Sequence, residues 1–191
     1  MLGHLPRMDA TIRRLERTDY EKLVRMYAEF EPKGQFQGLP PRTPELVVRW
    51  LCTLAELGDE QFVVEVGGRV VGHSMLCLGE DRTEAELTIF VHQDFRGLGL
   101  GRKLLLGTLN YGCKQLELNR VWLSVQGCNA HALRLFESVG FNMFGERSPL
   151  QWELNMERPS HCARCKGKDC VVFSDTLPRT VKIRRRKRLV H

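Results

Sequence analysis

The chain has 191 residues, which is enough for one domain with a well-packed core and a short appendage. Its 42% hydrophobic and 27% charged residues are ordinary for a soluble globular protein, and no apolar run reaches the roughly 20 residues that cross a bilayer. The N-terminus has no apolar segment followed by a small-residue cleavage site, so we expect no signal peptide, a cytoplasmic protein and no membrane association.

The net charge of +6 is distributed unevenly along the chain. Residues 1–160 contain 19 Lys and Arg against 21 Asp and Glu, whereas residues 161–191 contain 10 against 2. The basic character therefore belongs to the C-terminal extension and carries no information about the substrate of the preceding domain.

The first elements are short. Residues 10–16 alternate as a strand, and Asp19 offers a cap for the helix that follows. After a loop rich in Gly and Pro at 32–42, Thr43 and Pro44 predict the start of a second helix, as cap and first helical residue.

The centre of the chain predicts strands followed by a long helix. Gly67 and Gly68 separate two β-branched apolar runs, which is a strong hairpin signal. Residues 85–91 form a third strand pattern, and a glycine-rich turn leads from it into a long apolar helix.

The remaining pattern predicts a strand at 121–126, a helix beginning at Asn129 and ending at Gly140, and a closing hairpin. This order predicts the α+β class: a single mixed, mostly antiparallel sheet flanked by helices. We place this domain at residues 1–158 and a Cys-rich, basic extension at residues 159–191.

Seven cysteines without an export signal argue against a disulfide framework. Four of them lie in apolar segments and are expected to be small buried hydrophobic residues, namely Cys52, Cys77, Cys113 and Cys128.

The turn at residues 91–102, VHQDFRGLGLGR, connects a strand to a helix through three glycines. Glycines let a backbone approach a ligand closely, and the free amides of a helix start attract phosphate. The GxGxxG dinucleotide motif is absent, because Arg102 and Leu104 occupy the two positions where its third glycine would fall. The sequence therefore predicts a phosphate site other than a Rossmann one.

This turn resembles the [Q/R]-x-x-G-x-[G/A] motif of the GCN5-related N-acetyltransferase (GNAT) superfamily, here Arg96-x-x-Gly99-x-Gly101. A second stretch, residues 129–141 (NAHALRLFESVGF), is similar to the family pattern N-x-x-A-x-x-L-[YF]-x-x-x-G-F. The resemblance covers roughly residues 10–157 and implies a GNAT-like fold with acetyl-CoA as co-substrate.

The resemblance also implies roles for particular residues. The end of the strand before the turn would pair with the pantetheine arm, and the amide of Val91 would stabilise the developing oxyanion. Asn129 would hydrogen-bond near the pantetheine, and Phe136 would pack against the thioester. The residues expected to contact the co-substrate are Ile89, Phe90, Val91, Arg96, Gly97, Leu98, Gly99, Leu100, Gly101, Arg102, Asn129 and Phe136.

Acetyl transfer needs a general base, because an alkylamine is protonated at pH 7. Glu86 is our first candidate and Glu84 the second, since alternation places both on the strand face opposite Ala85 and Leu87. The alternative is that both are solvent-facing strand carboxylates.

Phe136 departs from the family pattern. Many members carry a Tyr there as general acid for the thiolate, and Phe has no proton to donate. A CoA thiolate, with the ordinary thiol pKa of about 8.5, can leave without a dedicated acid. Ser124 and Cys128 lie nearby in sequence as weak substitutes.

The extension contains C-x2-C-x4-C, formed by Cys162, Cys165 and Cys170. These cysteines could hold zinc with His161 as fourth ligand, or an iron–sulfur cluster, or form an exposed thiol tail. Lys182 to Arg188 could bind nucleic acid phosphates, but the segment lacks interleaved aromatics, and a solvated disordered tail is favoured.

The leading hypothesis is an N-acetyltransferase that transfers acetyl from acetyl-CoA to a primary amine by direct attack in a ternary complex. The alternatives are a non-catalytic acyl-CoA-binding module, or an acetyltransferase recruited to a partner or nucleic acid by its tail. The acceptor, the acyl preference and the oligomeric state, a homodimer included, stay open. Phe36 and Gln37 are placed beside the acceptor by positional analogy.

Overall fold

The computed structural model describes residues 8–34, 39–144, 153–159 and 179–183. The helices are η1 (Arg17–Asp19), α1 (Tyr20–Ala28), α2 (Pro44–Glu56), η2 (Gln93–Phe95), α3 (Leu100–Lys114) and α4 (Ala130–Ser138). The strands are β1 (Met8–Arg14), β2 (Glu60–Val66), β3 (Arg69–Leu78), β4 (Glu84–Val91), β5 (Arg120–Gln126), β6 (Asn142–Met143), β7 (Glu153–Pro159) and β8 (Arg179–Ile183).

All the described strands belong to one sheet in the order β6-β7-β5-β4-β3-β2-β1-β8. Every neighbouring pair is antiparallel except β4 and β5, which are parallel and joined by the crossover helix α3. The predicted α+β class, with one mixed and mostly antiparallel sheet, is confirmed.

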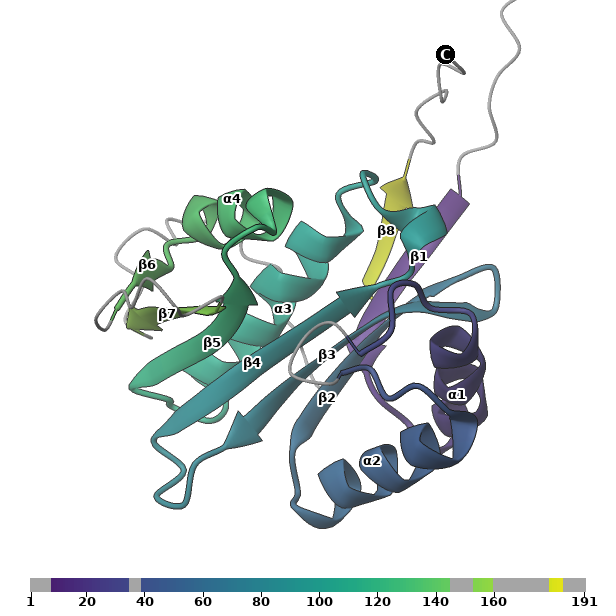
Figure 1. Ribbon diagram of the computed structural model, residues 1–191, viewed down its shortest axis with the longest axis horizontal. Helices are drawn as coiled ribbons and strands as arrows, with labels where there is room; N and C mark the ends of the chain where they lie inside the picture. Colours follow the sequence, from purple (N-terminus) through teal and green to yellow (C-terminus); the bar gives the residue numbers. More distant parts are fainter. Residues whose placement is uncertain (1–7, 35–38, 145–152, 160–178, 184–191) are drawn as a thin grey trace, which may run out of the picture.

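The helices cover both faces of the sheet (Figure 1). On one face α1 and α2 pack against β2, β3 and β4 around Leu23, Leu51 and Met75. On the other face α3 and α4 pack in two clusters, one of which contains Leu105 and Phe136. The site described below lies where these layers meet at the ends of β4 and β5.

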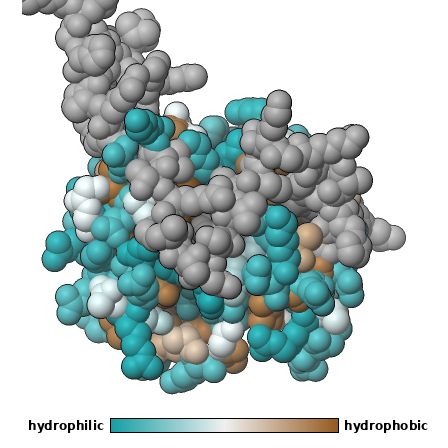
Figure 2. Space-filling view, turned by 180° about the vertical axis from the view of Figure 1, so that it is seen from behind, coloured by the Kyte–Doolittle hydropathy of each residue, from teal (hydrophilic) through white to brown (hydrophobic). Residues whose placement is uncertain are grey.

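Figure 2 shows the molecule from behind, where the coloured residues are mostly hydrophilic with small groups of hydrophobic ones between them. The buried side chains of the described helices are mostly apolar, Leu23, Leu51 and Leu104 among them, as expected for amphipathic helices covering a core.

Local sequence signals explain where several elements begin. The Thr43 side chain accepts a hydrogen bond from the Leu46 amide, so that it caps α2 as predicted. Gly67 and Gly68 both have positive φ, +57° and +78°, which is the conformation required for a tight hairpin between β2 and β3.

Strand β8 was not expected. The sequence predicts no strand in the extension, whereas residues 179–183 pair antiparallel with β1 from Ile12↔Arg179 to Met8↔Ile183. The segment reads Arg-Thr-Val-Lys-Ile. Val181 and Ile183 alternate with Thr180 and Lys182, as in a strand, but the neighbouring positive charges make this pattern difficult to recognise in the sequence. This part of the extension therefore continues the sheet of the main domain.

The burial predicted for the four scattered cysteines was wrong for two of them. Cys52 and Cys128 are exposed, Cys77 and Cys113 are partly buried, and none of these four forms a disulfide. The apolar residues around Cys52 in the sequence do not indicate whether it faces the core, because the α2 helix also exposes the apolar side chains of Leu46 and Val48.

A chain of buried polar groups lies beneath the α1–α2 layer. The Tyr27 hydroxyl contacts Nδ1 of His73 at 2.7 Å, and Nε2 of His73 contacts Oε1 of Gln61 at 3.1 Å. Tyr27 and His73 are fully buried, and burial lowers the pKa of His73 from 6.5 to about 3. His73 is therefore a neutral structural group.

The lowered pKa of His73 predicts that the folded protein loses stability at acid pH. Between about pH 6.5 and 3 the unfolded chain protonates His73 while the folded chain does not, so stability falls as the pH falls through this window. The His73 contribution from pH 7 to 5 is roughly 2 kcal/mol. Urea unfolding of the wild type and of His73→Gln at both pH values measures it. An equal pH dependence in the two proteins would contradict the assignment.

Candidate active site

The candidate site lies where the parallel strands β4 and β5 separate from each other. These strands pair only at Glu84↔Arg120, Ala85↔Val121 and Glu86↔Trp122, near the start of each strand. Beyond these pairs, a cavity of about 820 Å³ is lined by Leu87–Val91 of β4 and Leu123–Gln126 of β5. We call this gap the β4–β5 cleft.

The backbone of β4 presents alternate amides to the cleft. The His92 amide donates to the Val71 carbonyl of the neighbouring strand at 2.9 Å. Because successive residues of a strand point their N–H groups to opposite sides, the amides of Val91 and Ile89 face the cleft, whereas that of Phe90 faces β3. The predicted oxyanion amide of Val91 thus has the required direction, and Ile89 offers a second one.

The glycine-rich turn closes one end of the cavity. Gly97 and Gly99 have φ of +75° and +77°, and Gly99 is the N-cap of α3. A Cβ on either glycine would meet no atom within 4 Å, so the backbone conformation, rather than space, requires glycine at both positions. Gly101 lies in the first helical turn and also lines the cavity. The amides of this turn start a 15-residue helix, the arrangement that binds phosphate.

Some residues of the glycine-rich turn line the cavity, and others pack into the core. The residues that line the cavity are Arg96, Gly97, Gly99, Gly101 and Arg102, whereas Leu98 and Leu100 pack against the core beneath α3. The two leucines can therefore contribute only their backbone to a ligand in this cavity.

Arg96 holds the turn against the loop after α1. Its Nε donates to the Val91 carbonyl and one terminal nitrogen donates to the Glu31 carbonyl, both at 2.9 Å. Its guanidinium also lies 5.2 Å from the centre of the Phe30 ring. Arg96 thus connects the end of β4, the glycine turn and the α1 side of the cavity.

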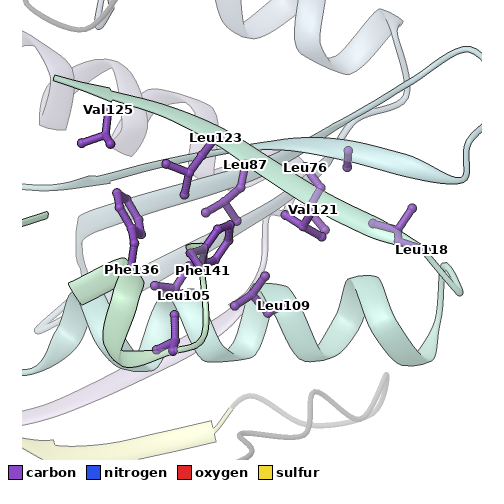
Figure 3. Close-up of a cluster of buried hydrophobic side chains, with 12 residues drawn as sticks. Leu76, Leu87, Leu105, Leu109, Leu118, Val121, Leu123, Val125, Phe136 and Phe141 are labelled. Atoms are coloured by element: carbon purple, nitrogen blue, oxygen red, sulfur yellow. The ribbon is translucent and has the colours of Figure 1, made fainter. Parts of the chain in front are cut away.

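Helix α4 forms the opposite wall. Asn129 accepts a hydrogen bond from the Ala132 amide and so caps the helix, and it also lines the cavity. Phe136 also lines the cavity and is only 6% exposed. Figure 3 shows Phe136 among the buried side chains of the β4–β5 layer and α3, close to Leu123 and Val125.

Two basic residues were missed by the sequence analysis. His131 and Arg134 line the cavity from α4, and Arg102 of α3 donates to the Ser138 hydroxyl at 2.7 Å, which connects the two helices. The i, i+3 spacing of His131 and Arg134 was the available signal, because it places both on one helix face. Together with the turn amides they give this end of the cavity an anion-attracting character.

The structure separates the two candidate bases. Glu86 lines the cavity. Glu84 is bound by Arg120, with Nη2 and Nε at 2.7 and 2.9 Å, and Arg120 also binds Glu157. Both carboxylates lie on the face predicted, opposite buried Ala85 and Leu87.

Glu86 is closer along the strand to the Ile89 amide than to the Val91 amide. At about 3.3 Å per residue, it lies roughly 10 Å from Ile89 and roughly 16 Å from Val91. A base at Glu86 would therefore act through water, and its distance favours the Ile89 amide as the nearer oxyanion donor.

The α1–α2 side of the cavity is apolar. We call these residues the acceptor wall: Phe30, Pro32, Leu39, Trp50, Leu54, Met75 and Cys77. Cys77 lies opposite Glu86 in the β3–β4 register, and burial, reinforced by Asp59 and Glu86, raises the pKa of its thiol. Its thiol is thus neutral and serves as part of the apolar surface.

Some predicted residues cannot be placed. Phe36, Gln37, His161, Cys162, Cys165 and Cys170 lie outside the described residues. Within the described ranges, no group of three or more His, Cys, Asp or Glu side chains is arranged to hold a metal ion. No helix in that part of the chain is long and apolar enough to span a membrane.

The sequence matches the model of the Acetyltransferase (GNAT) family over residues 19–141. Among curated relatives, a spermine/spermidine N(1)-acetyltransferase of Bacillus subtilis is 30% identical over 86 residues, covering 41% of this chain and 57% of the relative. A spermidine N(1)-acetyltransferase of Escherichia coli is 28% identical over 89 residues, covering 46% of this chain and 48% of the relative. The chain thus spans about half the length of the relatives it matches.

Solved structures share the fold. A GNAT acetyltransferase from Streptococcus pneumoniae superimposes with a TM-score of 0.65 at 21% identity, over 78% of this chain and 98% of the other. A spermidine N-acetyltransferase from Vibrio cholerae, in complex with CoA and spermine, gives 0.65 at 22%, over 79% and 95%. The motifs, the divergent parallel strands and the family match agree: the chain belongs to the acetyltransferase (GNAT) family.

Proposed function

We propose that the protein is an N-acetyltransferase that transfers the acetyl group of acetyl-CoA to a primary amine. The observation that carries this proposal is the β4–β5 cleft, which joins an amide-rich glycine turn at one end to Glu86 and the acceptor wall at the other. Acetyl-CoA complements this arrangement, because the amides of the turn can bind its pyrophosphate and the strand edge in the cleft can hydrogen-bond its pantetheine arm.

The chemistry follows from the residues of the cleft. Glu86 takes the proton of the acceptor ammonium through water, and the neutral amine attacks the thioester carbon. The amide of Ile89 or that of Val91, both of which face the cleft, donates to the carbonyl oxygen on which negative charge develops. Phe136 gives the thioester an apolar contact and no proton, so the CoA thiolate leaves without a dedicated acid.

Release of CoA thiol from acetyl-CoA tests the activity. The full chain would be assayed against a panel of monoamines, polyamines, amino acids, aminoglycosides and lysine peptides. Turnover with any amine supports the proposal. Tight binding of acetyl-CoA with no turnover toward any of them would favour a non-catalytic acyl-CoA-binding module.

We also propose that the GNAT domain proper ends near residue 158, with residues 179–183 of the extension adding strand β8 to its sheet. We further propose that the protein is cytoplasmic. The cysteine motif of the extension remains a proposed zinc or iron–sulfur site. Metal analysis of the purified chain tests it, and absence of stoichiometric zinc or iron would reject it.

A further inference from the structure

The acceptor wall has a fixed aromatic surface. The rings of Trp50 and Phe90 meet edge to face at 6.1 Å, and those of Phe30 and Phe90 do so at 5.6 Å. Tyr27, which is fully buried behind them, contacts Trp50 at 5.4 Å and is held by its hydrogen bond to His73. Since the three buried rings order the side chain of Trp50, which is only partly buried, an apolar substrate group can pack on Trp50 at little entropic cost to the protein.

The charged residues that line the cavity favour binding of a single ammonium group. Among the described residues that line the cavity, Glu86 is the single carboxylate, whereas Arg96, Arg102 and Arg134 are cationic. The Arg96 guanidinium lies 5.2 Å from the centre of the Phe30 ring, at the edge of the acceptor wall. A second ammonium on the substrate would lose water against apolar side chains and be repelled by Arg96.

We infer that the acceptor is a monoamine with an apolar body, aromatic or aliphatic, and not a polyamine. This inference rests on the proposed acetyl transfer and specifies the substrate class for that site. Its amine lies toward Glu86 and its body on Trp50 and the neighbouring apolar side chains of Pro32 and Leu39, all three of which are partly exposed. The curated relatives whose names specify polyamines align with fewer than half of the residues of this chain, and the spermidine N-acetyltransferase of Vibrio cholerae shares the fold at only 22% identity. The acceptor preference of these proteins therefore does not carry over.

Two pairs of amines test the inference on the wild-type protein. Hexylamine and 1,6-diaminohexane have the same chain and differ by one terminal ammonium, and 2-phenylethylamine and spermidine compare an aromatic body with a polycation. We expect kcat/KM to be higher by roughly tenfold or more for the monoamine of each pair. Equal or higher values for the diamine and spermidine would overturn the inference.

A second carboxylate on the acceptor wall should reverse part of this preference. Leu39 is partly buried at the edge of the wall, so Leu39→Glu can present a carboxylate there, and Leu39→Gln is the neutral control of the same shape. We expect the ratio of kcat/KM for 1,6-diaminohexane to that for hexylamine to rise roughly tenfold in Leu39→Glu relative to Leu39→Gln. An identical ratio in the two variants would contradict the charge argument.

The outcomes separate this inference from the proposed function. Preferred acetylation of the diamine and spermidine rejects the monoamine class but retains an N-acetyltransferase. Binding of acetyl-CoA, measured by calorimetry, with no acetylation of any amine in either pair or in the wider panel rejects both.

Discussion

Replacing Glu86 by glutamine is expected to lower kcat by roughly 10²–10⁴-fold, with the affinity for acetyl-CoA unchanged. Glu86 lines the acceptor side of the cavity, away from the glycine turn, so its loss removes the proton acceptor and leaves the phosphate site intact. At a pH near that of the amine's own pKa, about 10, the acceptor deprotonates without help. The deficit of Glu86→Gln should therefore shrink as the pH rises, which a pH–rate profile measures.

Glu84→Gln is the matched control. Glu84 lies two residues earlier on the same strand face, but Arg120 binds it outside the cavity lining. We expect its substitution to change kcat by less than roughly threefold, since exposed ion pairs contribute little. A loss as large as that of Glu86→Gln, or full activity of Glu86→Gln at pH 7, would contradict the assignment of Glu86 as the base.

Gly99→Ala is expected to weaken acetyl-CoA binding by roughly tenfold or more. Gly99 caps α3 at φ +77°, where a side chain costs about 1–2 kcal/mol and favours a shift of the backbone. Such a shift turns the amides of the helix start away from the pyrophosphate that they would bind. Isothermal titration with acetyl-CoA measures the affinity, and urea unfolding measures the cost in stability.

Gly58→Ala is the control that distinguishes the cost of backbone strain from a loss of acetyl-CoA binding. Gly58 follows α2 at φ +73°, and, as at Gly99, a Cβ there would meet no atom within 4 Å. Both variants should lose about 1–2 kcal/mol of unfolding free energy, but only Gly99→Ala should lose acetyl-CoA affinity. Equal affinities for the two variants would show that the glycine turn does not bind the co-substrate.

Local signals in the sequence predicted most of the fold. Thr43, the Gly67–Gly68 pair and Asn129 each act through a few neighbouring residues, so their caps and turn could be recognised from a short stretch of sequence. Strand β8 could not be recognised in this way. Its partner, β1, lies about 170 residues earlier in the chain, and its pairing depends on a sheet edge that exists only after folding.

The candidate site shows the same division. The two family motifs indicated the glycine turn, Asn129 and Phe136, because these residues are close together in sequence. The acceptor wall was not predicted as a unit, since Phe30, Trp50 and Cys77 come from the segment after α1, from α2 and from β3 and meet only through the tertiary packing. Likewise, the ion pair that distinguishes Glu84 from Glu86 depends on Arg120 of another strand.

The short contact between β4 and β5 leaves the two halves of the sheet joined by three residue pairs. Next to this contact, a cluster of buried side chains joins Leu87 of one half to Leu123 and Phe136 of the other (Figure 3). The volume of that cluster sets the width of the cleft, because close-packed interiors transmit strain instead of absorbing it. Residues such as Leu105 and Leu109, which do not line the cavity, thereby determine how far apart the substrate-facing strand edges stand.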